Sequence, residues 1–216
     1  GGAVGISRIA DLTLTGITTG QVNLDYTGNF TSDVTITGDA NSIDTLVAAD
    51  RDNIWTITGS KAGTLNTTSS FTDIEILNGS GGNDTFLFKI GPSVSNLMIF
   101  GGSQQTGGQD ILQLDTGLTG VTLIAGDFQS IERYVGNANT NNTLQGASGS
   151  GTTNTWSIED VDGAGTVFDG VNDGKVNNTE FVNFAVLKGG ATNSTDNFTF
   201  VGGASLSGTS GIDGNG

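Results

Sequence analysis

A short phrase that closes on glycine recurs through the first 126 residues and constrains the fold more than any other feature. Each copy combines strand-favouring residues with an aliphatic residue two positions before the glycine. The copies are DLTLTG (11–16), DVTITG (33–38), IWTITG (54–59), IEILNG (74–79), NLMIFG (96–101) and VTLIAG (121–126). Their glycines lie 20 to 25 residues apart, which indicates a repeat architecture because an ordinary globular domain does not demand near-constant spacing.

A second, longer phrase begins with phenylalanine and recurs across both halves of the chain. Its copies are FTDIEILNG from Phe71, FQSIERYVG from Phe128 and FVNFAVLKG from Phe181. A tryptophan phrase precedes two of them, as NIWTI (53–57) and NTWSI (154–158). Trp55 lies 16 residues before Phe71. Trp156 lies 25 residues before Phe181, so we predict an insertion of nine residues within an acidic loop over residues 159–180.

A period near 21 residues, with short strands and glycine-rich corners, predicts an all-β fold of the β-solenoid type. About ten coils of roughly 21 residues would make residues 1–216 a single segment, with each strand pairing in parallel with the next coil. The corners need left-handed backbone, which glycine adopts freely, and the chain contains 36 Gly. A β-sandwich is the alternative, because it also uses many short strands. The aliphatic residues that share one position in the phrase are expected to form one inward column: Leu14, Ile36, Ile57, Leu77, Ile99 and Ile124.

Composition excludes several classes of function. The chain has 22 acidic and 7 basic residues, and the basic residues are scattered singly, so no basic patch for nucleic acid is expected. No apolar run approaches the roughly 20 residues of a membrane helix, so membrane insertion is not expected. The chain has no Cys and no His, which excludes disulfides and catalysis by Ser-His-Asp or Cys-His groups. The few bases do not cluster as a polysaccharide lyase requires, and we do not expect an enzyme.

The segment from Trp55 to Phe88, with a looser copy from Trp156 to Phe200, resembles repeats of large secreted bacterial surface proteins. These are the filamentous-haemagglutinin-like proteins and the adhesins with haemolysin-type calcium-binding repeats. The resemblance covers about half of the chain. It implies a right-handed parallel β-helix, export to the cell surface, and a role in adhesion, surface structure or cell–cell contact.

One candidate calcium ligand is Asp84, in GSGGNDTFLF (79–88). The stretch resembles the nonapeptide G-G-x-G-x-D-x-U-x, in which U is a large apolar residue and adjacent turns share each calcium ion. Such sharing needs tandem copies, whereas the copies here are isolated; looser relatives contain Asp44, Asp110 and Asp196. The alternative is that each Asp caps a corner by accepting hydrogen bonds from backbone N–H groups.

The predicted insertion contains a second calcium candidate, DGVNDGKVNNTE (169–180). Asp169, Asp173 and Glu180 match positions 1, 5 and 12 of an EF-hand loop, and glycine stands at position 6. Position 3 departs from the pattern, because Val171 stands where Asp or Asn is required. Two nearby carboxylates could add ligands, those of Asp160 and Asp162. The alternative is an acidic loop in solvent.

We therefore expect a structural or adhesive segment of an extracellular bacterial surface protein or filament. The alternative is a calcium-dependent carbohydrate-binding module. Expected partners are copies of the chain, neighbouring repeats of the same chain, surface polysaccharide or another cell. We expect both ends to be cuts within a longer repetitive chain, so that the segment continues into neighbouring coils or stacks head to tail with another copy. The aromatic residues Trp55, Trp156, Tyr26 and Tyr134 could stack on sugars; for the two tryptophans we expect core packing.

Overall fold

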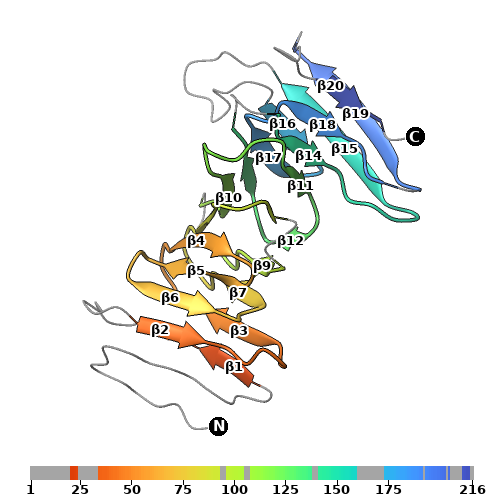
Figure 1. Cartoon of the computed structure of the whole chain (residues 1–216). Coiled ribbons are helices and arrows are strands. Elements are labelled where there is room, and N and C mark those ends of the chain that lie inside the picture. The colour runs from red at the N-terminus through yellow and green to blue at the C-terminus, as the bar shows by residue number, and fades with distance from the viewer. Residues whose placement is uncertain are drawn as a thin grey trace.

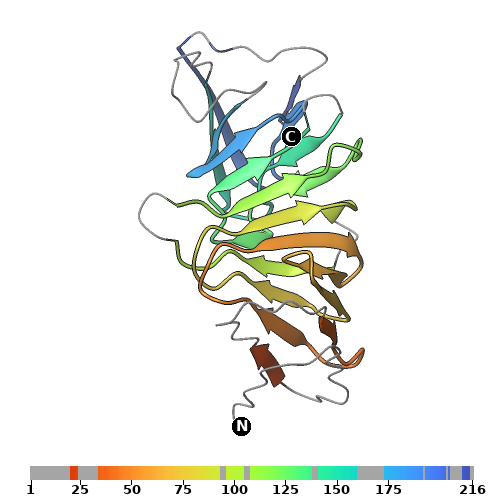
Figure 2. The same ribbon diagram turned by 90° about the vertical axis from the view of Figure 1, so that its left-hand side faces the viewer.

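The computed structural model describes residues 20–23, 34–92, 96–104, 108–137, 141–159, 173–191, 193–202, 204 and 211–214. Its elements, β1 to β20, are all strands, which confirms the predicted all-β fold. The strands stack along one long axis, with the N-terminal strands at one end and the C-terminal strands at the other (Figures 1 and 2). Along the chain, strands pass repeatedly between one long mixed sheet and two parallel sheets.

The mixed sheet has 11 described strands and extends through most of the stack. From one edge to the other it contains β19 (Thr195–Val201), β15 (Thr153–Glu159), β16 (Asp173–Val176), β17 (Thr179–Val182), β13 (Arg133–Val135), β10 (Ile111–Leu114), β8 (Thr85–Phe88), β4 (Ile54–Gly59), β5 (Ala62–Leu65), β6 (Ser69–Thr72) and β2 (Val34–Thr37). Most of these strands alternate buried and partly exposed residues. In β8, for example, Phe86 and Phe88 point inward, which is the two-residue period of a sheet with one buried face.

The two parallel sheets follow one another along the stack. The first contains β1 (Gly20–Asn23), β3 (Asp44–Val47), β7 (Ile76–Asn78), β9 (Met98–Phe100) and β12 (Phe128–Gln129). The second contains β11 (Thr122–Ile124), β14 (Thr143–Gln145), β18 (Val186–Lys188) and β20 (Gly211–Asp213). Every described pair in these two sheets is parallel, as the sequence predicts.

The mixed sheet departs from the prediction of uniform parallel pairing at two places. Strands β4, β5 and β6 form an antiparallel meander, and so do β15, β16 and β17. Tight turns make three of these reversals possible, because Lys61 (φ 52°), Asn66 (φ 51°) and Asn177 (φ 53°) take left-handed backbone between β4 and β5, between β5 and β6, and between β16 and β17. Each tryptophan phrase is thus the first strand of a meander inside the mixed sheet, and not one strand of a simple coil.

Inward side chains stack in register across neighbouring strands and form the core. In the first parallel sheet, Leu46, Leu77, Ile99 and Phe128 follow one another from strand to strand. In the mixed sheet the series is Trp55, Phe86, Leu112, Tyr134 and Phe181. In the second parallel sheet it is Leu123, Leu144, Leu187 and Ile212. All of these side chains are buried except that of Ile212, which lies on the terminal strand β20.

The prediction of a single aliphatic column is wrong. Its members Ile36, Ile57, Leu77 and Ile99 are buried, but the first two lie in the mixed sheet and the last two in the first parallel sheet. Ile124 is partly exposed in the second parallel sheet, and Leu14 lies outside the described residues. The cause is the first meander, which uses residues 54–72 without leaving the mixed sheet, so the next copy of the phrase falls in another sheet.

Candidate functional site

A row of polar side chains runs along one edge of the core, at the points where successive strands enter the mixed sheet. We call Asn53, Asp84, Asp110 and Glu132 the corner ladder, because each immediately precedes a strand: β4, β8, β10 and β13. These strands are parallel neighbours, so the four residues lie above one another. The ladder therefore follows the long axis of the molecule.

Each carboxylate of the corner ladder accepts a hydrogen bond from the backbone of the preceding member. Asp84 Oδ1 accepts from the backbone N of Asn53 at 2.9 Å and from Asn53 Nδ2 at 2.8 Å. Asp110 Oδ1 accepts from the backbone N of Asp84 at 2.7 Å, and Glu132 Oε2 from the backbone N of Asp110 at 2.9 Å. Backbone-to-backbone hydrogen bonds join the same strands; for example, Ile111 N donates to the Asp84 carbonyl oxygen at 2.8 Å. Charged acceptors make these bonds strong and tie neighbouring strands together.

Glycines at the ends of the preceding strands make room for the ladder. A Cβ at Gly79 would lie 2.2 Å from Asp84 Oδ2 and 2.3 Å from the Gly101 carbonyl oxygen. A Cβ at Gly101 would lie 2.4 Å from Asp110 Oδ2 and 1.9 Å from the Ser130 carbonyl oxygen. Neither glycine has left-handed backbone. The closing glycine of the repeated phrase is thus needed for close approach of the next strand, and the predicted role in left-handed corners does not apply at these two positions.

Burial changes the acidity of the ladder. It raises the pKa of Asp84 to about 7, although the hydrogen bonds from Asn53 oppose this change. Burial also raises the pKa of Asp110 and of Glu132. Asp84 and Asp110 are fully buried side by side, so their charges repel when both are ionised. Asp84 therefore changes charge close to neutral pH.

The geometry of Asp84 matches the corner-capping interpretation. Its Oδ1 is occupied by the two N–H groups of Asn53, and its Oδ2 packs against Gly79. Sequence reasoning singled out Asp84 and Asp110 but missed Asn53 and Glu132. Their signal is positional, because each stands directly before a strand that pairs with its neighbours. Within the part of the chain that the structure describes, no three Asp or Glu residues are grouped so that they could hold a metal ion.

The second calcium candidate is only partly described. Asp173 opens β16 and is buried, opposite Glu159 on β15. Glu180 lies on β17, opposite Lys175 and Arg133 on its two neighbouring strands, and its Oε2 accepts a hydrogen bond from Gln109 Nε2 at 2.8 Å.

Parts of the predicted loop 159–180 are therefore strands: Glu159, 173–176 and 179–180. The connection 160–172 lies outside the described residues, and with it Asp160, Asp162 and Asp169. A calcium site over residues 169–180 stays a prediction.

The structure contains the same module twice. The first module, residues 53–88, consists of meander β4–β6, strand β7 and strand β8; the second, residues 154–200, consists of β15–β17, β18 and β19. In the first, Trp55 stacks on Phe86 (ring centroids 5.8 Å apart) and meets the edge of Phe71 (6.0 Å). In the second, Trp156 stacks on Phe198 (5.1 Å) and meets the edge of Phe181 (5.9 Å). Both tryptophans are fully buried, which confirms their expected core role.

The second module contains a counterpart of the Asn53–Asp84 pair, but the pKa of its Asp is lowered and not raised. Asp196 Oδ1 accepts from Asn154 Nδ2 at 2.8 Å, just as Asp84 accepts from Asn53. Asp196 also accepts from the backbone N of Gly190 at 3.0 Å and from Ser194 Oγ at 3.0 Å. Burial acts to raise the pKa of Asp196, but these hydrogen bonds outweigh it and the pKa is lowered.

A groove of about 310 Å³ lies where the two parallel sheets meet. It is lined by Pro92, Asn96, Leu97, Met98, Thr122, Ile124, Asp127 and Phe128. Among the described residues of this lining, Asp127 is the one that is ionisable, and burial raises its pKa. The other described lining residues are mainly apolar.

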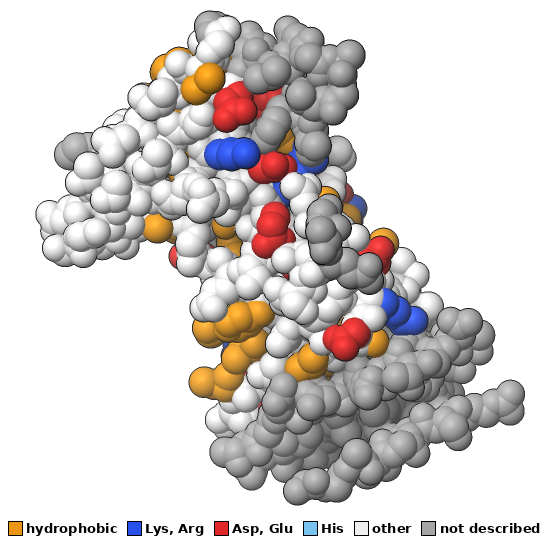
Figure 3. All heavy atoms as spheres, turned by 180° about the vertical axis from the view of Figure 1, so that it is seen from behind, with side chains coloured by type: hydrophobic (Ala, Val, Ile, Leu, Met, Phe, Trp, Pro, Cys, Tyr) orange, Lys and Arg blue, Asp and Glu red, His pale blue; other side chains and the backbone are white. Residues whose placement is uncertain are grey.

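Charged side chains form few clusters on the described part of the face shown in Figure 3. On the face shown in Figure 3, acidic and basic side chains lie singly or in small groups among polar ones, without a basic patch. No described helix is long and apolar enough to cross a membrane. In comparisons with known proteins, no family model, no curated protein and no solved structure matches this chain.

Proposed function

We propose that the chain is a structural segment of an extracellular bacterial surface protein or filament, built as a right-handed parallel β-helix. The observation that supports this proposal is the continuity of the contacts along the long axis. Backbone hydrogen bonds and stacked core residues link neighbouring levels of the stack, and the corner ladder adds side-chain bonds from β4 to β13. A polypeptide wound in this way is a rod whose stiffness comes from contacts between neighbouring levels.

The contacts suit a load-bearing role. Neighbouring levels share backbone hydrogen bonds and stacked aromatic or aliphatic side chains, and the levels from β4 to β13 also share the carboxylate bonds of the corner ladder. Because the contacts are between nearest neighbours, a pulled rod should lose its levels one group at a time. A net charge of −15 would keep such rods soluble and limit their lateral association. Adhesion to another cell or to surface polysaccharide is part of this proposal, with the rod as the spacer.

A calcium-dependent carbohydrate-binding module is the second candidate, and the acidic residues over 159–180 are the observation that favours it. Three of the four aromatic residues considered for sugar stacking, Trp55, Trp156 and Tyr134, are buried. The fourth, Tyr26, lies outside the described residues. Stacking on sugars by this chain would therefore not use Trp55, Trp156 or Tyr134.

Pulling experiments separate the two functions. The whole chain is held by its ends between two handle proteins in optical tweezers and stretched with calcium and with a chelator. The rod predicts discrete steps in extension, at forces that do not depend on calcium. Smooth extension at low force would contradict the rod. Steps that need calcium, together with calcium-dependent retention on polysaccharide, would favour the carbohydrate-binding module.

A further inference from the structure

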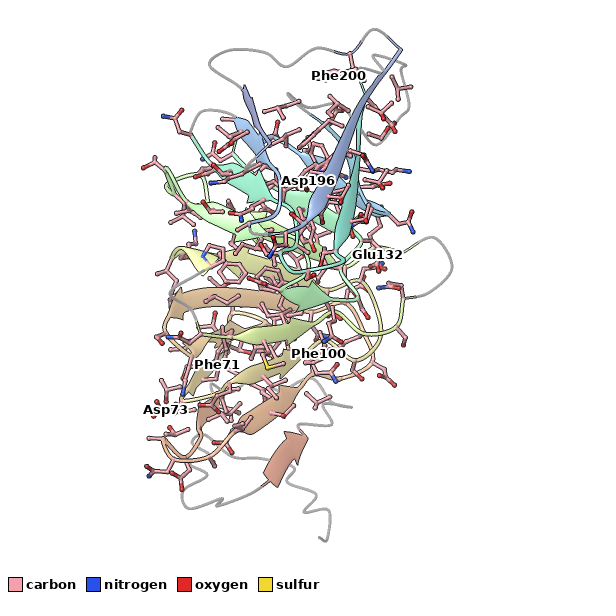
Figure 4. The ribbon with its side chains drawn as sticks, turned by 90° about the vertical axis from the view of Figure 1, so that its right-hand side faces the viewer. Phe71, Asp73, Phe100, Glu132, Asp196 and Phe200 are labelled. Atoms are coloured by element: carbon pink, nitrogen blue, oxygen red, sulfur yellow. The ribbon has the colours of Figure 1, made fainter. Side chains whose placement is uncertain are left out.

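Strand β19 forms one edge of the mixed sheet as far as the structure describes it. Among the described strands it pairs with β15 alone, in parallel. Figure 4 shows Asp196 and Phe200 on this strand at the C-terminal end of the stack. The side chain of Phe200 is 47% exposed and that of Val201 is 43% exposed. On the neighbouring terminal strand β20, Ile212 is 38% exposed.

The first module shows what covers the equivalent strand. Strand β8 holds the position of β19, because Phe86 and Phe88 pair with Trp55 and Ile57 just as Phe198 and Phe200 pair with Trp156 and Ile158. In the first module, β10 pairs in parallel with the other side of β8. With β10 in place, Phe88 is fully buried. Phe200 is therefore exposed at a level where, among the described strands, the second module has no counterpart of β10.

The backbone N–H and C=O groups of β19 point in the same directions as those of β8. In β8, the carbonyls of Asp84 and Phe88 accept from Ile111 N (2.8 Å) and Asp115 N (2.9 Å) of the β10 segment. In β19, Thr195 N donates toward β15, to the Thr152 carbonyl at 2.9 Å, as Thr85 N donates toward β4 in the first module. Backbone groups alternate in direction along a parallel strand, so those of Asp196, Phe198 and Phe200 point to the open edge.

The backbone N–H group of Asp196 determines which strand would fit beside β19. In the first module the backbone N–H of Asp84 is satisfied by the carboxylate that leads β10, that of Asp110. After this Asp, the inward positions two and four residues later are Leu112 and Leu114, which are buried. The equivalent N–H in the second module belongs to Asp196. An occupant of the open edge would satisfy it only if it brings an acceptor at the same place.

We propose that the β19 edge binds a parallel strand that begins with Asp and has large apolar residues two and four positions later. This inference rests on the proposed function, because a rod that grows level by level meets such a strand next. Self-pairing of β19 between two copies of the chain fits less well. It would bring together two chains of net charge −15, and an antiparallel pair would place no leading carboxylate at the Asp196 amide.

A peptide tests the proposal with the whole chain. The probe is a fluorescently labelled peptide of sequence GQDILQLDT, which copies residues 108–116. We expect saturable binding by fluorescence anisotropy. A peptide with Ala in place of its first Asp, the copy of Asp110, should bind about tenfold more weakly, which is 1.4 kcal/mol, because the Asp196 amide then loses its acceptor. A peptide with Ser in place of both Leu residues should not bind.

Two variants of the chain locate the binding site. Phe200→Pro removes an N–H that points to the open edge but leaves the pairing with β15 intact, because proline is tolerated where its missing N–H would face solvent. Binding should be lost in this variant. Phe200→Leu keeps both the N–H and an apolar side chain, so binding should persist. Circular dichroism and the fluorescence of the buried tryptophans verify that both variants fold.

Several outcomes would overturn the inference. One is that the native peptide does not bind the native chain. A second is that the native peptide binds Phe200→Pro as well as it binds the native chain, and a third is that the peptide lacking its first Asp binds the native chain as well as the native peptide does. A spin label on the first residue of the peptide should broaden NMR signals near Asp196 and not near Val201; the reverse pattern would show antiparallel binding. Dimers that form through β19 and resist the peptide would also contradict it. If the pulling experiment shows a rod and the peptide does not bind, only this inference fails.

Discussion

Replacing Asp84 by asparagine should remove a pH dependence from the stability of the fold. Asp84 is fully buried and its pKa is raised to about 7. An acid whose pKa is higher in the folded state than in the unfolded state stabilises the fold while it is protonated. The contribution of Asp84 to the free energy of unfolding should therefore be fully present below about pH 4 and should be lost as the pH rises through about 7.

The magnitude follows from the two pKa values. A rise from the ordinary value of 3.8 to about 7 corresponds to at most about 4 kcal/mol, at about 1.4 kcal/mol for each tenfold change in proton affinity. Asp84→Asn keeps an oxygen that can accept from both N–H groups of Asn53. The variant should match the native chain near pH 4 and exceed its stability at pH 8. Asp110 and Glu132, whose pKa values are also raised, would retain a weaker dependence of the same sign.

Urea denaturation between pH 4 and pH 8, followed by tryptophan fluorescence, measures this effect. The matched control is Asp196→Asn, at the equivalent position of the second module. Because the pKa of Asp196 is lowered in the folded state, its charge stabilises the fold above pH 4 and the benefit is lost as the pH falls. This control should therefore be less stable than the native chain at neutral pH. Equal slopes of unfolding free energy against pH for the native chain and Asp84→Asn would refute the reasoning.

Three further predictions concern packing and calcium. Gly79→Ala should lower the free energy of unfolding by about 1–3 kcal/mol or more in denaturant titrations, because its Cβ would clash with a carbonyl oxygen at 2.3 Å; Gly59→Ala, whose Cβ would have its nearest neighbour at 3.4 Å, should be tolerated. Ile57→Ala should cost about 2–5 kcal/mol as a core cavity, whereas the half-exposed Ile54→Ala should cost far less in the same assay. Calcium titration followed by thermal unfolding should raise the melting temperature if residues 159–180 bind the ion, and no shift up to millimolar calcium would contradict that prediction.

Much of the local structure can be predicted from the sequence, because strand formation depends on neighbouring residues. Alternation of apolar and polar residues around Trp55 and Phe86 predicts strands with one buried face, and the structure has them. Glycine at the end of the repeated phrase marks the end of a strand at Gly59 and immediately follows one at Gly79. The burial of both tryptophans follows from their place in these strands. In the second copy of the tryptophan phrase, β15 ends at Glu159 and β16 begins at Asp173, and the predicted insertion of nine residues within 159–180 stays a prediction.

The sequence indicates only part of the corner ladder. Asp84 and Asp110 stand out because each follows a glycine-rich turn, but no local signal assigns the acceptor of one to the amide of the other. The bond from Asp84 N to Asp110 Oδ1 joins residues 26 apart, and that from Asn53 N to Asp84 Oδ1 joins residues 31 apart. Spacings between bonded ladder members vary because the loops between them vary. Asn53 and Glu132 were missed for this reason.

Residues a few places apart set the kind of element, so strands, corners and inward positions follow from local sequence patterns. The sheet that each strand joins depends on the folded molecule as a whole. Copies of one phrase that differ little in sequence lie in different sheets, at Ile57 and Leu77, because a left-handed turn at Lys61 folds the first back on itself before the chain crosses the core. In the second meander, the turn at Asn177 places Asp173 and Glu180 on adjacent strands, although their spacing in the sequence predicts a loop. Strand pairing depends on backbone hydrogen bonds and core packing between residues far apart in the chain. A repeated local pattern is compatible with several such pairings, so it does not determine which one forms.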